Sequence, residues 1–229
     1  MRAVSPSADL KARVLAAASR TPSPTYDRTR RSAQAVLIAG AAVPAALFVA
    51  TGGLDHGEGR PRGVFAASMS VWIVAAVVAL WAAVGRGRAP MGRATPWLVG
   101  VAAGTPSLIL LAMGALSAAL PTRDALLLGS VHRLAASCMS MTFAAALLPL
   151  LAMLFVRRGS DPVHPATHGA ALGAAFGAFA GVMVCLWCPD VSLRHIALGH
   201  VAPLVLTSLA GAAAGARLLP MAPPRRGST

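Results

Sequence analysis

Residues 168–187 read HGAALGAAFGAFAGVMVCLW and contain no Asp, Glu, Lys or Arg. A helix of about 20 apolar residues crosses the hydrocarbon core of a bilayer, so these residues predict a transmembrane helix. Glycines recur in it every fourth residue, at Gly169, Gly173, Gly177 and Gly181. This spacing places them nearly on one helix face, where another backbone can approach closely. We interpret them as packing positions within a bundle, with dimerisation as the alternative.

Five further apolar stretches extend the same pattern along the chain. The six predicted spans are residues 33–53, 64–84, 97–120, 134–156, 168–187 and 196–219. Of the 229 residues, 56% are hydrophobic and 12% charged, whereas soluble domains are roughly a quarter charged. The composition excludes an ordinary soluble domain. It predicts an all-α polytopic membrane protein: a six-helix transmembrane bundle over 33–219, a leader with a short amphipathic helix over 1–32, and a disordered tail over 220–229.

Basic residues orient these spans. Fifteen of the 20 Lys and Arg fall in the leader, in the connections after spans two and four, and at the C-terminal end from Arg217 onward, and five fall in the other connections. Cytoplasmic segments are enriched in Lys and Arg, so both termini are predicted to face the cytoplasm. The net charge of +13 is therefore interpreted as membrane anchoring, and no direct contact with nucleic acid is expected.

Small and aromatic residues add two expectations about packing. Gly100 with Gly104 and Gly211 with Gly215 repeat the four-residue spacing in spans three and six, which predicts further close helix contacts. Four tryptophans lie near the ends of spans or about a turn or two inside them, a placement interpreted mostly as the interfacial aromatic belt; they are Trp72, Trp81, Trp97 and Trp187.

The sequence lacks the features typical of a coupled transporter and the common catalytic motifs. All seven acidic residues fall outside the apolar spans, whereas proton- or cation-coupled transporters normally place ionisable groups inside the membrane. There is no P-loop, GxSxG or HExxH motif. We therefore expect neither a coupled pump nor an enzyme.

The three cysteines fall on one side of the membrane in the predicted topology. Cys138 lies near the outer start of span four, and Cys185 and Cys188 lie at the outer end of span five, where CxxC spacing on a helix lets both face one partner. His132, His195 and His200 lie near the same level. Thiolates and imidazoles bind zinc, copper or cadmium, and an oxidising exterior permits a disulfide. The alternative is that the cysteines are small apolar fillers.

A family resemblance rests on particular residues. Cys138 lies near the start of the fourth of six short spans, Cys188-Pro189-Asp190 ends the fifth, and the sixth ends in the small-residue run GAAAGARLL at 211–219. This pattern, over about residues 33–219, resembles the NrsF-like membrane anti-sigma factors. A Trp-Tyr pair expected early in span six reads Gly199-His200 here.

The resemblance implies a function. Members of that family hold an extracytoplasmic-function sigma factor at the bacterial inner membrane and release it on a signal. Their paired cysteines, implicated in metal or oxidative sensing, correspond to Cys138 and Cys188, and Cys185 is an additional thiol. The expected partners are thus a sigma factor and the lipid bilayer, and the implied ligand is a transiently bound soft metal ion.

The leader offers the sigma factor a contact surface. Leu10, Val14 and Leu15 are its best apolar contacts, on a predicted helix over residues 9–19. The sigma factor is expected to bind the leader, the short inner loops, or both; otherwise the leader is only a frayed tail. The alternative functions are a small metal-handling transporter or permease, or a structural membrane subunit.

Overall fold

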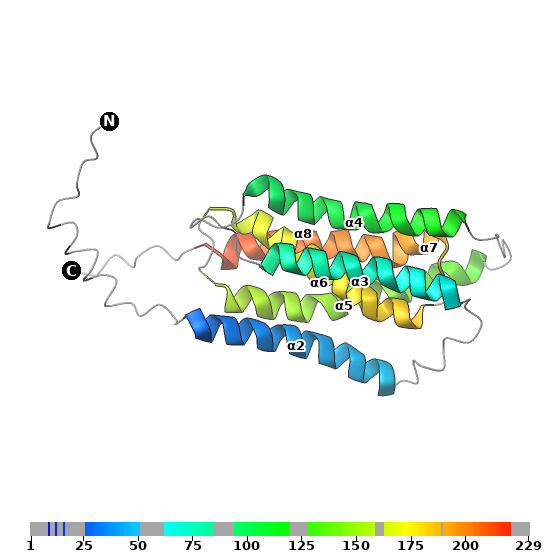
Figure 1. Cartoon of the computed structure of the whole chain (residues 1–229), viewed down its shortest axis with the longest axis horizontal. Coiled ribbons are helices and arrows are strands. Elements are labelled where there is room, and N and C mark those ends of the chain that lie inside the picture. Colours follow the sequence, from blue (N-terminus) through cyan, green and yellow to red (C-terminus); the bar gives the residue numbers. More distant parts are fainter. Residues whose placement is uncertain are drawn as a thin grey trace.

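The computed structural model describes residues 26–50, 62–84, 94–119, 128–158, 163–188 and 190–220, together with residues 9, 12 and 16. All regular secondary structure in these ranges is helical, as predicted. The helices run side by side along one long axis (Figure 1). The leader residues Leu10, Val14 and Leu15 lie outside the described residues, and so does the tail beyond residue 220.

The helices coincide with the six predicted spans. They are α2 (Tyr26–Ala50), α3 (Arg62–Val84), α4 (Thr95–Ala118), α5 (Leu128–Val156), α6 (Pro165–Trp187), and a composite last helix made of α7 (Leu193–His195), η3 (Ile196–Val201) and α8 (Ala202–Leu218). Several begin before the predicted apolar boundary: α2 at Tyr26 rather than Ala33, and α5 at Leu128 rather than Leu134. Hydropathy marks only the part of a helix that prefers lipid, and helices continue into polar residues beyond it.

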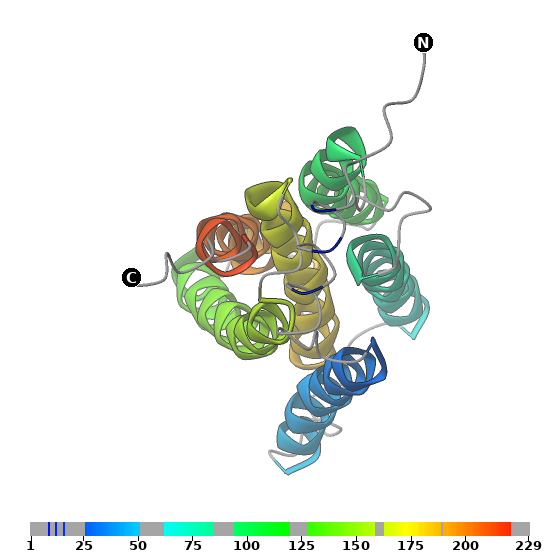
Figure 2. The same ribbon diagram turned by 90° about the vertical axis from the view of Figure 1, so that its left-hand side faces the viewer.

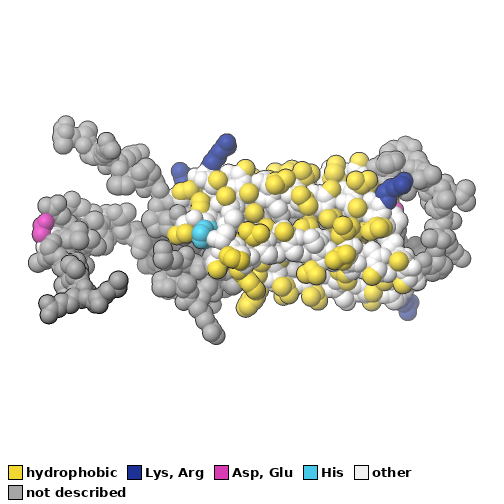
Figure 3. All heavy atoms as spheres, turned by 90° about the horizontal axis from the view of Figure 1, so that it is seen from above, with side chains coloured by type: hydrophobic (Ala, Val, Ile, Leu, Met, Phe, Trp, Pro, Cys, Tyr) yellow, Lys and Arg dark blue, Asp and Glu magenta, His cyan; other side chains and the backbone are white. Residues whose placement is uncertain are grey.

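The outer surface of the bundle suits a bilayer. In the described residues, α3, α4, α6, the last helix and Leu134–Val156 of α5 are each long and apolar enough to cross a membrane. Helix α2, whose side chains are described only in part, is not among these five. Large apolar side chains point outward, among them Val77, Leu108, Leu111, Leu148 and Leu209. Figure 3 shows hydrophobic side chains along the length of the bundle and Lys and Arg towards its two ends.

Helix α6 is the centre of the bundle. It contacts α2, α3, α4, α5 and α8, which surround it in Figure 2. Its glycines explain the closest of these contacts. A Cβ on Gly169 would meet the carbonyl oxygen of Gly211, and a Cβ on Gly173 would meet that of Thr207. The backbones of α6 and α8 therefore touch, and the repeated glycines pack within the chain.

Two packing expectations were wrong. Trp72 is not at an interface: its side chain is 0% exposed, and its ring fills the space beside Gly181 of α6. Among the described residues, no atom from another part of the fold lies within 4 Å of the place a Cβ would take on Gly100 or Gly104, so this pair on α4 does not mediate a close contact with another described helix. Spacing alone does not say which face of a helix meets a neighbour.

An arginine links three helices at one end of the bundle. Arg157, just past α5, donates to the carbonyl oxygen of Val84 at 3.0 Å and lies 2.7 Å from Nε2 of His168 on α6. These contacts join the ends of α3, α5 and α6. The carbonyls at a helix C-terminus lack intrahelical partners and carry partial negative charge, so a guanidinium there is stabilising.

Candidate metal or thiol site

Four buried side chains converge at the other end of the bundle. They are Cys138 of α5, Cys188 just beyond α6, His195 of α7 and His200 of η3. Each offers one ligand atom, and these atoms all lie within 4.8 Å of one another. Helix α7 lies at the end of the bundle opposite the start of α2 and the end of α8 (Figure 1). The structure thus brings together the two cysteines that the family resemblance pairs, and adds two histidines.

Cys188 owes its position to the residue that follows it. The residue before a proline is disfavoured in the α conformation, and Pro189 follows Cys188. Helix α6 accordingly ends at Trp187, and Cys188 is extended, with φ −79° and ψ 115°. The sequence interpretation treated Cys185 and Cys188 as two positions on one helix, and this was wrong. Cys185 instead lies in the core beside Ser68, its Sγ 4.0 Å from Oγ, and is not a member of the four-residue cluster.

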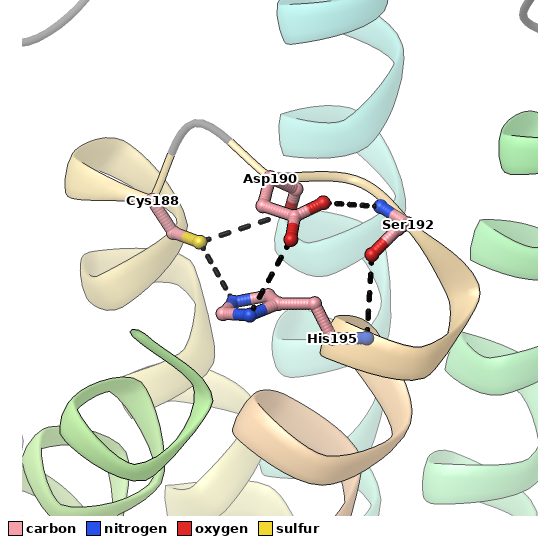
Figure 4. Close-up of polar contacts among 4 residues, drawn as sticks. All are labelled: Cys188, Asp190, Ser192 and His195. Carbon is pink, nitrogen blue, oxygen red and sulfur yellow. Dashed lines mark hydrogen bonds and ion pairs between the residues drawn. The ribbon is translucent and has the colours of Figure 1, made fainter. Parts of the chain in front are cut away.

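Short polar contacts hold the turn between α6 and α7 (Figure 4). Sγ of Cys188 lies 2.9 Å from Nε2 of His195, and the backbone N–H of Ser192 donates to Oδ1 of Asp190 at 2.7 Å. The hydroxyl of Ser192 accepts from the backbone N–H of His195 at 3.4 Å and caps α7. On the far side of the imidazole, Oδ2 of Asp190 lies 3.7 Å from Nδ1 of His195. The turn therefore aims the Nε2 edge of His195 at Cys188.

A π-helix places the two histidines together. In an α-helix, residues five positions apart point about 140° apart around the axis. In a π-helix the backbone bonds join residues five apart, so such positions lie nearly above one another. Residues Ile196–Val201 form a π-helix, and the N–H of Ala202 donates to the carbonyl of Ala197. As a result, the ring centroids of His195 and His200 lie 5.2 Å apart.

Gly199 leaves the room for this arrangement. A Cβ at this position would lie 3.2 Å from Nε2 of His195 and 3.3 Å from Cβ of Cys138. Both distances are tighter than ordinary van der Waals contact. The Gly199-His200 pair, which departs from the expected Trp-Tyr, thus supplies both a candidate ligand and the space beside it.

His200 is buried without hydrogen bonds. Its side chain is 1% exposed, and neither ring nitrogen has a hydrogen-bond partner among the described residues. The ring packs against Trp72, with centroids 5.7 Å apart. An unpaired buried polar group costs about 1–3 kcal/mol. The buried imidazole of His200 therefore lies beside the other three clustered side chains with hydrogen-bonding capacity to spare.

The surroundings of Cys188 favour the neutral form of its thiol. Hydrogen bonding with the Cys138 thiol and burial raise the pKa of the Cys188 thiol above its ordinary value, although His195 and His200 act in the opposite direction. Metal binding or oxidation at Cys188 therefore requires the thiol to lose its proton. Of the other predicted site residues, His132 lies on α5 with its side chain outside the described part of the chain.

Fold and site together define a helical membrane bundle with a buried thiol–imidazole cluster at one end. The sequence profile of the NrsF family, described as "Negative regulator of sigma F", matches residues 15–220. The chain belongs to this family of negative regulators of a sigma factor. No curated protein and no solved structure gives a significant match.

Proposed function

We propose that this protein holds a sigma factor at the bacterial inner membrane and releases it when Cys138 and Cys188 bind a soft metal ion or are oxidised. The observation that carries the proposal is the juxtaposition of these two sulfurs, which come from α5 and from the end of α6. In a family of negative regulators of a sigma factor, such a pair of thiols detects the signal that causes release. In the oxidative case an external two-electron oxidant accepts two electrons and two protons from the thiols, and one S–S bond forms between the two sulfurs.

Helix α5, which carries Cys138, and helix α6, which Cys188 directly follows, also reach the opposite end of the bundle. There Arg157 of the α5 terminus contacts His168 of α6 and the last carbonyls of α3. Drawing Cys138 and Cys188 together on a ligand shifts α5 against α6, and Arg157 and His168 move with these helices. A packed interface transmits such a shift because it switches between discrete arrangements.

Two histidines at the start of α6 lie far from the four-residue cluster. Twenty residues of chain separate His168 from Cys188, which corresponds to about 30 Å of helix. His164 and His168 therefore lie near one end of α6 and the four clustered residues near the other. This separation favours a regulator over a metal permease, and we propose no enzymatic activity.

Leu10→Asp with Val14→Asp should weaken capture of the sigma factor by about tenfold or more if the leader carries the contact. A buried aliphatic side chain contributes roughly 1.5–3 kcal/mol, and 1.4 kcal/mol is a factor of ten. Capture is measured by titrating sigma factor onto membrane vesicles that carry the full chain. Ser5→Asp with Ser7→Asp is the matched control, because it adds the same charge where aspartate can cap a helix. Equal capture by both double variants would move the contact to the inner loops.

Reporter fusions should place both ends of the chain in the cytoplasm. The basis is the distribution of Lys and Arg, fifteen against five, and an even number of spans. Fusions at residues 25, 90, 160 and 225 should report cytoplasm, and fusions at 57, 127 and 192 the exterior. A C-terminal reporter active outside would contradict the orientation and the outward-facing site.

A further inference from the structure

We propose that Cys138, Cys188, His195 and His200 together form a four-ligand Cys2His2 site for one zinc or cadmium ion. The claim that this ion is the releasing signal rests on the proposed function and makes it more specific. The claim that the four residues bind an ion rests on the geometry of the cluster alone. The sequence pairs Cys138 with Cys188 through the family resemblance and places His132, His195 and His200 near the same level; the structure brings His195 and His200 into one cluster with the two cysteines.

The geometry fits a tetrahedral ion. Zinc binds sulfur at about 2.3 Å and imidazole nitrogen at about 2.0–2.1 Å, so tetrahedral ligand atoms lie about 3.3–3.8 Å apart. The four atoms here lie within 4.8 Å of one another, and the Cys188–His195 pair is at 2.9 Å. Small side-chain rotations bring them to the required spacing. The ligands come from α5, the end of α6 and the start of the last helix, so the ion cross-links three segments.

The charge balance suits a buried position. On binding, the two thiols lose two protons and each sulfur donates a lone pair, while both imidazoles bind neutral. The net charge of two thiolates and one divalent cation is then zero. An isolated buried charge is costly, and this neutral assembly avoids it in a cluster whose four residues are all buried.

His200 points independently to a ligand. Both of its ring nitrogens are buried and lack hydrogen bonds within the described chain. A metal ion satisfies one of them. His195 is oriented in the manner of many metal-bound histidines, with Nε2 towards the cluster and Nδ1 facing the carboxylate of Asp190 at 3.7 Å.

The ligand types define the class of ion. Sulfur and imidazole favour zinc and its soft congener cadmium, whereas magnesium and calcium require oxygen ligands. The π-helix is part of the site, because it brings His195 and His200 to one side of the last helix. Single π-turns are frequently found at functional sites.

Cobalt and zinc titration of the purified full-length protein in detergent tests the proposal. After removal of metal and reduction of the thiols, we expect one Co²⁺ per chain with the intense visible bands of tetrahedral thiolate coordination, displaced by Zn²⁺. His195→Gln, His200→Gln, Cys138→Ser and Cys188→Ser should each weaken binding at least about 100-fold, since loss of a mere hydrogen-bond partner of a ligand costs 10–100-fold. Cys185→Ser, outside the cluster, should bind like the wild type.

A second measurement needs no variant. X-ray absorption on the zinc-loaded wild type should show two sulfur and two nitrogen neighbours. An oxygen-rich or sulfur-only shell, or wild-type affinity in His200→Gln, overturns the site. Sigma-factor capture is measured on the same preparation: metal binding without capture contradicts the proposed function and leaves the site standing, whereas capture without metal binding contradicts the site alone.

Discussion

Cys138→Ser and Cys188→Ser should each abolish induction of the sigma-dependent reporter by zinc, cadmium or oxidant, while repression without a signal is retained. Serine has nearly the size of cysteine but lacks the soft, oxidisable sulfur. Structural zinc sites bind with roughly 10–16 kcal/mol over four ligands, so losing one ligand removes at least about 2.5 kcal/mol. That loss is close to 100-fold in affinity. Reporter activity against inducer concentration measures the effect.

Cys185→Ser is the matched control for this pair. Cys185 is also buried, but it packs beside Ser68 and does not belong to the cluster. Its replacement should leave the inducer response unchanged. A normal response in both Cys138→Ser and Cys188→Ser would return these cysteines to the role of apolar filler.

Gly173→Ala should lower the free energy of unfolding by about 1–3 kcal/mol, the usual cost of overpacking. The added Cβ would meet the carbonyl oxygen of Thr207 and lie 2.7 Å from Cα of Ser208. Both are backbone atoms, so α6 and α8 must separate. Alanine is intrinsically the better helix former by about 1 kcal/mol, and a loss of stability therefore reports the helix contact itself. Unfolding in detergent micelles is the measurement.

Gly104→Ala provides the same chemical change without the contact. In the part of the chain that the structure describes, no other segment lies within 4 Å of its Cβ position, so the stability of Gly104→Ala should equal or exceed that of the wild type. Gly173→Ala as stable as Gly104→Ala would contradict the close packing of α6 on α8. Since α8 continues from the segment that carries the two histidines, Gly173→Ala should also weaken metal binding.

The helices were predictable because their signals are local. A long apolar run needs a helix to satisfy its backbone in lipid, and this holds whatever the neighbours are. Glycine spacing likewise marked α6 as a packing helix. Glycine spacing wrongly predicted a close helix contact at Gly104, and position along the span wrongly predicted an interfacial Trp72. Both predictions failed because burial depends on which face of a helix meets another helix.

The site was predictable only in part. The family resemblance paired Cys138 with Cys188, and position along the spans placed His195 and His200 at the same level. The convergence of the two histidines depends on the π-helix at 196–201. Neither residue type nor periodicity predicts a π-helix. Pro189 was the missed signal for Cys188, since it ends α6 and removes the thiol from the helix that carries Cys185.

Retention of a sigma factor on membranes tests the central claim most directly. Vesicles carrying the full chain, washed with chelator and reductant, should retain one sigma factor that vesicles without the chain do not, identified by mass spectrometry. Addition of zinc or cadmium should release it into the supernatant. Vesicles that retain no sigma factor, or whose sigma factor stays bound with metal and with oxidant, would contradict the claim that this protein is a signal-released sigma-factor anchor.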